Sequence, residues 1–214
     1  MTLHTRQGHL LDVNPVARLL RASAHELDID GDGVPDGPAD PGAADATARM
    51  LLAHLVLASG ELWVTERDGE IVAASVWVPG GDDAASVRAG ALDQLLRREL
   101  KVDRVVDAVG PAVHLRPALE SAMAEVGDLI QLSSARLVLF AVAVAPHVEP
   151  HDVVTMARTV VEPVLSRDEP VLAVAIDDGR GALLRQSGFA TVGRVPLGEG
   201  NEVWLGGRRP ALVA

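Results

Sequence analysis

The sequence contains no cysteine. A chain without thiols forms no disulfide, no thiolate nucleophile and no thiolate-bound metal site. It also has no apolar run that approaches the roughly 18 to 20 residues of a membrane-spanning helix, and its N-terminus lacks a basic stretch followed by an apolar one. We therefore expect a soluble, cytoplasmic protein that is not targeted elsewhere and that has no membrane as a partner.

Positive charge is scarce relative to negative charge, and the formal net charge at pH 7 is -11. Proteins bind nucleic acid by neutralising phosphates with Lys and Arg, so this charge excludes nucleic acid as an expected partner. The chain also lacks the Gly-x-Ser-x-Gly, Gly-Lys-Ser/Thr and His-Glu-x-x-His motifs. Serine hydrolase, nucleotidase and zinc protease functions therefore find no support.

Apolar residues, by contrast, are abundant, at 48% of 214 residues. This is enough to fill the core of one sizeable domain. We expect a single domain over residues 1–214. Its predicted parts are an N-terminal strand and helices (1–60) with an acidic loop (28–45), a hairpin (61–79), a helical insert (85–127), and a core crossover unit with closing strands (136–208).

The core unit is predicted from two apolar runs. Residues 136–145 are nearly all apolar, which is typical of a central strand covered on both faces, and residues 171–176 form a second such run. A helix over 152–166 separates them, and a short helix over 180–186 follows. This order indicates a crossover with parallel strands. The predicted fold class is α/β, an α+β mixed central sheet flanked by helices on both faces.

Two further helices have recognisable ends. Asn14-Pro15 is a good helix start, with Asn as N-cap and Pro at the first helical position, and this helix is expected to run to about Leu27. Another is expected over residues 114–126, with Gly127 as its C-terminal stop.

The segment Leu183–Phe189 reads Leu-Leu-Arg-Gln-Ser-Gly-Phe. It resembles the Asn-x-x-Leu-Tyr-x-x-x-Gly-Phe segment of the GNAT superfamily of N-acetyltransferases. The hairpin of residues 61–66 and 71–79 is similar to the second and third strands of that family. Residues 191–197 and 201–206 resemble its closing strand pair. The resemblance implies a GNAT-like fold.

The same resemblance implies an acyl-CoA site. In the family, the strand that corresponds to residues 136–145 carries a bulge whose backbone N–H groups hold the thioester carbonyl, which assigns cofactor contacts to Val142 and Val144. The family's Asn that contacts the cofactor corresponds to Arg180. Acyl-CoA is the one cofactor that the resemblance implies, and nothing else in the sequence indicates a cofactor.

The loop that should bind the pyrophosphate departs from the family pattern Gln/Arg-x-x-Gly-x-Gly/Ala. Glu149 replaces the basic or amide residue, Pro150 has no N–H, and Asp152 and Val154 stand where glycine or a small residue is expected. Each carboxylate would repel a pyrophosphate by ~1 kcal/mol or more. Leu184 occupies the position of the family's Tyr, which often protonates the leaving thiolate, and the chain contains no tyrosine.

We therefore predict a GNAT-fold enzyme that acts on a small molecule and does not use acetyl-CoA in the usual way. The candidate catalytic residues are His147, His114 and Glu149, because histidine titrates near pH 6.5 and a carboxylate can orient it. Acid–base chemistry such as cyclisation or isomerisation is one branch of this prediction. The alternatives are an N-acyltransferase with atypical CoA binding and a non-enzymatic binding or regulatory protein. The sequence leaves open whether the protein forms a homodimer.

Aromatic residues make up only 2% of the chain, which draws attention to Trp63 and Trp77. We predict that they form an apolar wall for the substrate; the alternative is plain core packing.

Two stretches suggest a metal site. Asp28–Gly37 has the carboxylate spacing of a calcium loop, but Ala39 stands at the twelfth position, where a bidentate carboxylate is needed. His147 and His151 flank Glu149, but the spacing crosses a proline. The prediction is that neither binds a metal.

Overall fold

One mixed sheet organises the part of the chain that the computed structural model describes, which is residues 3–23, 46, 48–50, 52–54, 60–80, 116–176, 178–197 and 202–208. The sheet has seven strands in the order β1-β2-β3-β4-β5-β7-β6. The strands are β1 (Leu3–Gln7), β2 (Glu61–Arg67), β3 (Glu70–Pro79), β4 (Leu137–Val144), β5 (Val171–Ala175), β6 (Ala190–Pro196) and β7 (Glu202–Arg208). Neighbouring strands are antiparallel except β4 and β5, which pair in parallel as predicted.

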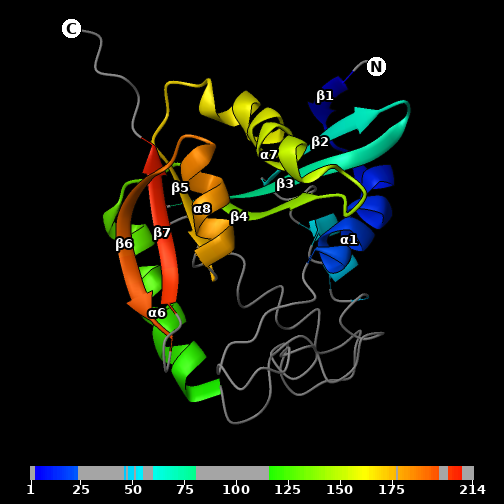
Figure 1. Ribbon diagram of the computed structural model, residues 1–214. Coiled ribbons are helices and arrows are strands. Elements are labelled where there is room, and N and C mark those ends of the chain that lie inside the picture. The colour runs from blue at the N-terminus through cyan, green and yellow to red at the C-terminus, as the bar shows by residue number, and fades with distance from the viewer. Residues whose placement is uncertain are drawn as a thin grey trace, which may run out of the picture.

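Helices cover both faces of the sheet, which confirms the predicted fold class (Figure 1). They are α1 (Val13–Ala22), preceded by the short 3-10 helix η1 (Leu10–Asp12), α6 (Arg116–Leu132), α7 (Pro150–Leu165) and α8 (Asp178–Gln186). On β3, the Ser75 hydroxyl donates a hydrogen bond of 2.9 Å to the carbonyl of Val160 on α7. On β7, Val203 and Leu205 pack with α6, whereas Trp204 between them lies against α8.

The main core packs the sheet against α1 and α7, and Trp77 and Trp204 are its largest members. The indole of Trp77 is fully buried, and its N–H donates a hydrogen bond of 2.9 Å to Ser75. Because Ser75 in turn bonds to α7, the indole lies on the α7 face of β3. Trp77 is therefore a core residue, which corrects its prediction as a substrate contact: a side chain with no exposed surface lines no cleft.

The ends of α1 and α6 differ from the prediction. Helix α1 begins at Val13 rather than after Asn14, because the Asp12 carboxylate accepts the N–H of His9 at 2.9 Å and starts the turn earlier. The helix ends at Ala22 rather than at about Leu27, with Ser23 as C-cap. Helix α6 continues through Gly127 to Leu132. A glycine inside a helix costs only about 1 kcal/mol relative to alanine, and the packing of Leu129 and Ile130 against the sheet offsets that cost.

An ion-pair network fixes the N-terminal strand. The guanidinium of Arg6 on β1 donates to both carboxylate oxygens of Asp12, at 2.7 and 2.8 Å, and to Glu66 on β2. The hydrogen bonds from Arg6 lower the pKa of the buried Asp12 below its usual value, although burial alone would raise it. These bonds join β1, η1 and β2, the three elements at this edge of the sheet.

Candidate functional site

A cleft opens where β4 and β5 diverge. The two strands pair only from Leu137 to Leu139, opposite Val171 to Ala173, and among the described residues no pairing joins them beyond that point. A cavity of about 250 Å³ occupies the gap between them. Most of its lining side chains are apolar: Leu20, Leu139, Phe140, Ala141, Val142, Val174, Ala175, Ile176 and Leu184. An open α/β sheet commonly binds ligands at such a gap beyond its strand ends.

A bulge in β4 forms one wall of this cleft. Val76 on β3 pairs with Ala141, but the next residue, Trp77, pairs with Leu139, so Phe140 is an extra residue in the ladder. Its side chain is 60% exposed and lines the cavity. Bulges commonly redirect side chains beside active sites. Phe140 was not predicted as a site residue, although it is the single aromatic residue in an otherwise aliphatic strand.

The backbone of β4 beyond the bulge presents polar groups to the gap. The N–H of Ala145 donates a hydrogen bond of 2.8 Å to Val72 on β3. Because N–H and C=O groups alternate in direction along a strand, those of Val142 and Val144 point to the other edge, from which β5 has diverged. This arrangement supports the predicted contacts of Val142 and Val144 with a ligand carbonyl, which stay a prediction.

Helix α8 supplies the opposite wall. Arg180, on the first turn of α8, donates a hydrogen bond of 2.7 Å from Nη2 to the carbonyl of Ser23, the C-cap of α1. The contact therefore spans the cleft between the helices on its two sides. Leu184 also lines the cavity and is almost completely buried. The position that the resemblance assigns to a proton-donating Tyr thus carries an aliphatic side chain in the cleft.

The predicted pyrophosphate loop forms the N-terminus of α7. Pro150 is the first helical residue, where a missing N–H is normally tolerated, and the N–H of Asp152 already donates to the carbonyl of Glu149 at 2.8 Å. His147 and Glu149 are exposed and do not line the cleft, and neither side chain forms a hydrogen bond or ion pair with another described residue. This helix start therefore offers an anion few N–H donors and two carboxylates.

Trp63 lies away from the cleft. Its indole N–H donates to Glu61 at 2.9 Å, and the guanidinium of Arg167, which follows α7, stands 5.9 Å from the ring centre. Burial alone would raise the pKa of Glu61, but hydrogen bonds from Arg167 and Trp63 lower it below its usual value. Trp63 thus belongs to a half-buried polar network, and the cleft lining does not include it.

Other predicted features fall outside the described residues. These include His114, which was a catalytic candidate, residues 85–115 of the predicted helical insert, and the acidic loop 28–45, with its calcium-like spacing. Within the described ranges, no group of three or more His, Asp or Glu side chains could hold a metal ion. In the same ranges, no helix is long and apolar enough to cross a membrane.

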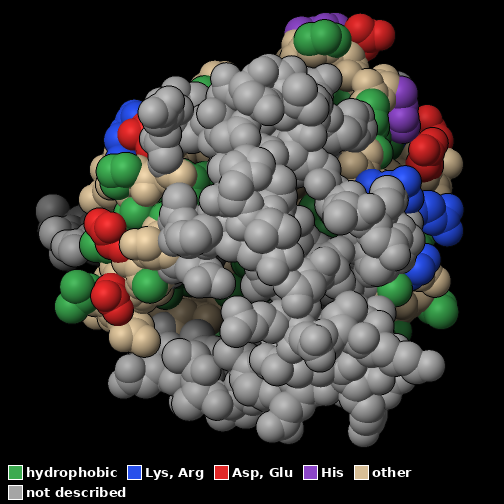
Figure 2. Space-filling model, turned by 90° about the horizontal axis from the view of Figure 1, so that it is seen from below, with side chains coloured by type: hydrophobic (Ala, Val, Ile, Leu, Met, Phe, Trp, Pro, Cys, Tyr) green, Lys and Arg blue, Asp and Glu red, His purple; other side chains and the backbone are tan. Residues whose placement is uncertain are grey.

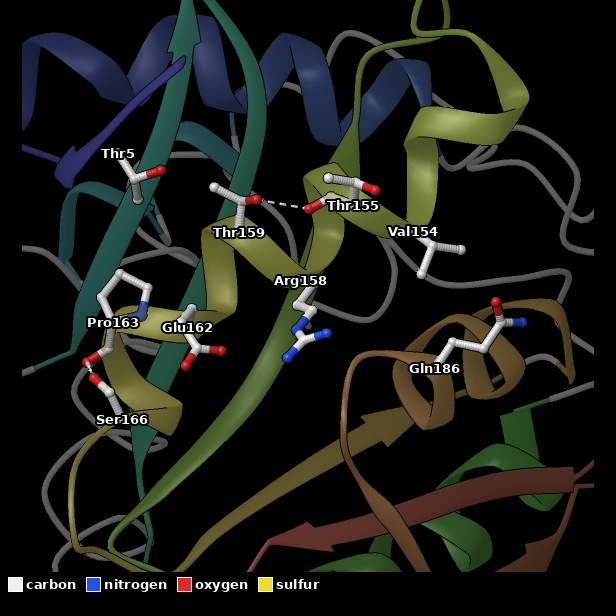
Figure 3. Close-up of a pocket in the computed structure, with 9 residues that line it drawn as sticks. All are labelled: Thr5, Val154, Thr155, Arg158, Thr159, Glu162, Pro163, Ser166 and Gln186. Carbon is white, nitrogen blue, oxygen red and sulfur yellow. Dashed lines mark hydrogen bonds between the residues drawn. The ribbon is translucent and has the colours of Figure 1, made fainter. Parts of the chain in front are cut away.

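A second hollow, of about 630 Å³, lies along the outer face of α7. Figure 3 shows Thr155, Arg158 and Glu162 of α7 and Gln186 of α8 around it. Its lining is mainly hydroxyl and charged side chains, and no residue of β4 or β5 contributes. This hollow is larger than the cleft, but it lacks the apolar lining and the diverging strand edges of the cleft. The β4–β5 cleft is therefore the candidate site.

Comparison with solved structures identifies the fold. The chain superposes on a GNAT-family acetyltransferase from Bacillus cereus with a TM-score of 0.53 at 11% identity, covering 98% of this chain and 99% of that one. It also superposes on the polyamine N-acetyltransferase of Drosophila melanogaster, which forms N-acetylagmatine, with a TM-score of 0.59 at 15% identity and coverage of 97% and 100%. The predicted GNAT fold is confirmed.

A third similar structure is the C-terminal condensation domain of Ebony in complex with beta-alanyl-dopamine. Its TM-score is 0.62 at 10% identity, and the match covers 97% of this chain and 99% of that domain. No protein-family model matches the sequence, and no curated protein matches it. The likeness is therefore one of fold.

Proposed function

We propose that this protein is a GNAT-fold enzyme that acylates a small-molecule amine in the β4–β5 cleft, and that its acyl donor is not acetyl-CoA bound in the usual way. The observation that carries the proposal is the divergence of β4 and β5 after Leu139, with the bulge at Phe140 beside it. This gap gives an extended ligand an apolar floor and a strand edge to bond to.

The cleft suits the binding of an acyl group. The apolar lining and the exposed ring of Phe140 would cover its hydrocarbon part. The backbone N–H groups of Val142 and Val144 would donate to its carbonyl oxygen, where negative charge develops as the amine attacks. The nitrogen–carbon bond forms, the bond to the leaving group breaks, and the amine proton goes to a base.

The base that we propose is His147. It lies in the turn that follows β4 but does not line the cleft, so it would take the amine proton through a bridging water. Its exposed imidazole forms no hydrogen bond with another described residue. Leu184 supplies no acid, so the leaving group must depart as a stable anion or take its proton from water.

The start of α7 disfavours a CoA donor bound in the usual way. A pyrophosphate binds where several backbone N–H groups point at it and positive charge surrounds it. Here Pro150 has no N–H, the N–H of Asp152 is already used, and Glu149 and Asp152 add two carboxylates. The structures of a polyamine acetyltransferase and of a condensation domain with a bound amide support an amine acceptor.

The test is an acyl-transfer assay with a panel of small amines, using either acetyl-CoA or short acyl thioesters of a simple thiol as donors, with products identified by mass spectrometry. We expect amide formation from the simple thioesters. His147→Ala should lower turnover by roughly 100-fold or more, the scale of general base catalysis. His151→Ala, an exposed histidine of the same segment, is the matched control and should retain the rate.

If none of the tested donors yields an amide, the proposal is overturned. Equal rates in the native protein and in His147→Ala would remove His147 from it.

A further inference from the structure

We propose that the acyl group transferred in the β4–β5 cleft is an unbranched chain of about six to eight carbons rather than an acetyl group, and that Ala141 and Leu20 set its length. This inference rests on the proposed function, because it names the class of acyl donor for that reaction. It is carried by the lining, the shape and the volume of the cavity between the two strands.

The cavity crosses the sheet, because residues from both faces line it. Val174 and Ile176 of β5 pack against an apolar cluster to which α6 contributes. Ala175, between them, pairs with Trp204, which lies against α8 on the opposite face. Leu184 of α8 completes the lining on that face. A chain that enters from one face can therefore extend between the strands toward the other.

The inner end of the cavity is narrow. Leu139 and Ala173 form the last pair between β4 and β5, and paired strands lie about 4.8 Å apart. The gap therefore widens outward from that pair. An unbranched chain can reach the narrow end with its terminal methyl group, whereas a branched end would have to push aside Leu139, which is almost completely buried.

The cavity is larger than an acetyl group needs. Its volume is about 250 Å³. A water-sized group occupies about 30 Å³, so the cavity holds roughly eight such groups. The strand from Val142, which is predicted to contact the carbonyl, back to Leu139 covers about 10 Å. An extended chain advances about 1.2 Å per bond, so roughly eight bonds cover the same distance.

The lining matches a neutral hydrocarbon. Most of the lining side chains are apolar, and the one charged residue among the described residues of the lining, Arg180, already donates to the carbonyl of Ser23. By contrast, the Asp, Glu, Lys and Arg side chains coloured in Figure 2 lie at the outer margins of the molecule. Each methylene that leaves water for such a lining should raise the affinity about 4-fold.

Ala141 and Leu20 determine how much of the cavity is open to a chain. Ala141 is half-buried and lines the cavity next to the bulge, and Leu20, also half-buried, lines it from α1. A leucine at position 141 would fill the space of about three carbons, and an alanine at position 20 would free about as much.

The experiment is a calorimetric titration of the full chain with butanol, hexanol, octanol and decanol. We expect the affinity to rise about 4-fold per methylene from butanol to hexanol. It should stop rising between octanol and decanol, where the cavity is full. The compound 3,3-dimethylbutan-1-ol, which has as many carbons as hexanol but a branched end, should bind about 10-fold more weakly than hexanol.

Two variants test the residues that set the length. Ala141→Leu should move the end of the rise about three carbons earlier, and Leu20→Ala about three carbons later. Ala190→Leu, the same enlargement on the edge strand β6, is the matched control and should change no affinity, because Ala190 is exposed and does not line the cleft. Thermal unfolding checks that each variant is folded, and Ala141→Val replaces Ala141→Leu should the larger side chain prevent folding.

An acyl-transfer assay separates this inference from the proposed function. With thioesters of one simple thiol, kcat/KM for the hexanoyl and octanoyl groups should exceed that for the acetyl group at least 10-fold, a value set at about two buried methylenes. Chain-length-dependent binding in a protein that forms no amide would overturn the proposed function alone. Equal affinities along the alcohol series, no shift in a folded variant at position 141, or acetyl transfer as fast as hexanoyl transfer would overturn this inference.

Discussion

At the scale of single residues, Phe140 distinguishes a binding role from a structural one. Its side chain is 60% exposed, so removing the ring should change the free energy of unfolding by no more than about 1 kcal/mol. The ring also walls the cleft, so Phe140→Ala should weaken the binding of a hexyl ligand by about 10-fold, which corresponds to part of the ~1.5–3 kcal/mol gained by burying an aromatic side chain. Calorimetry and denaturant unfolding measure the two effects.

Val192→Ala is the control for this change, because Val192 is equally exposed, at 61%, and does not line the cleft. Should both variants bind the hexyl ligand like the native protein, Phe140 would have no part in the site.

Asp12 provides a prediction about stability and pH. Asp12→Ala removes one of the two carboxylates that pair with the mostly buried Arg6 and leaves Glu66 as the other. This change should cost ~3 kcal/mol of unfolding free energy at pH 7. Because Arg6 lowers the pKa of Asp12 in the folded state, its contribution is fully present above the unfolded value of about 3.9 and is lost as the pH falls through the lower, folded value. The gap in stability between the native protein and the variant should therefore narrow as the pH falls below about 3.9.

Urea unfolding over that pH range tests this expectation. Glu202→Gln, which breaks the more exposed pair with Arg194, should cost less than about 1 kcal/mol at pH 7. A constant gap between native protein and Asp12→Ala from pH 7 to pH 2.5 would show that the carboxylate charge is not what Asp12 contributes.

At the scale of elements, the start of α7 decides which donor binds. The triple variant Glu149→Gln, Asp152→Gly and Val154→Ala restores the glycine, the small residue and the neutral charge that the family pattern has in this loop. We expect acetyl-CoA to bind the triple variant at least 10-fold more tightly than the native protein, because two repulsive carboxylates are gone and the backbone can approach a pyrophosphate.

The double variant Glu162→Gln and Glu169→Gln removes the same two charges from the other end of α7 and from the segment after it, and it should leave acetyl-CoA binding as in the native protein. An equal gain in both variants would mean that net charge, rather than the loop, controls the interaction.

The sequence predicts the existence of these elements better than it predicts their ends. The apolar run at 136–145 and the order of elements were sufficient for the parallel β4–β5 pair, because a strand buried on both faces has few other solutions. Gly127 was wrong as a helix end because tertiary packing of Leu129 and Ile130 outweighs a local preference, and this packing is not visible in a single sequence.

At the scale of the whole molecule, the site is less predictable than the fold. Trp77 and Phe140 are both aromatic residues in apolar strands, yet one is buried under α7 and the other is exposed by a bulge. The difference depends on a one-residue shift in register, and period-2 alternation does not reveal such a shift. Arg180 was identified through resemblance, but its link to Ser23, 157 residues earlier, depends on the complete fold.

The central claim is that the cleft between β4 and β5 binds an acyl donor without using its pyrophosphate. The most direct measurement compares, by calorimetry, the affinities of the native protein for acetyl-CoA and for the acetyl thioester of a simple thiol, which has the same acyl group and no nucleotide. Our account predicts that acetyl-CoA binds no more tightly than the simple thioester, because Glu149, Pro150 and Asp152 offer its pyrophosphate no favourable contact. A 10-fold or greater preference for acetyl-CoA, with its pyrophosphate against residues 149–154 in a crystal, would contradict it.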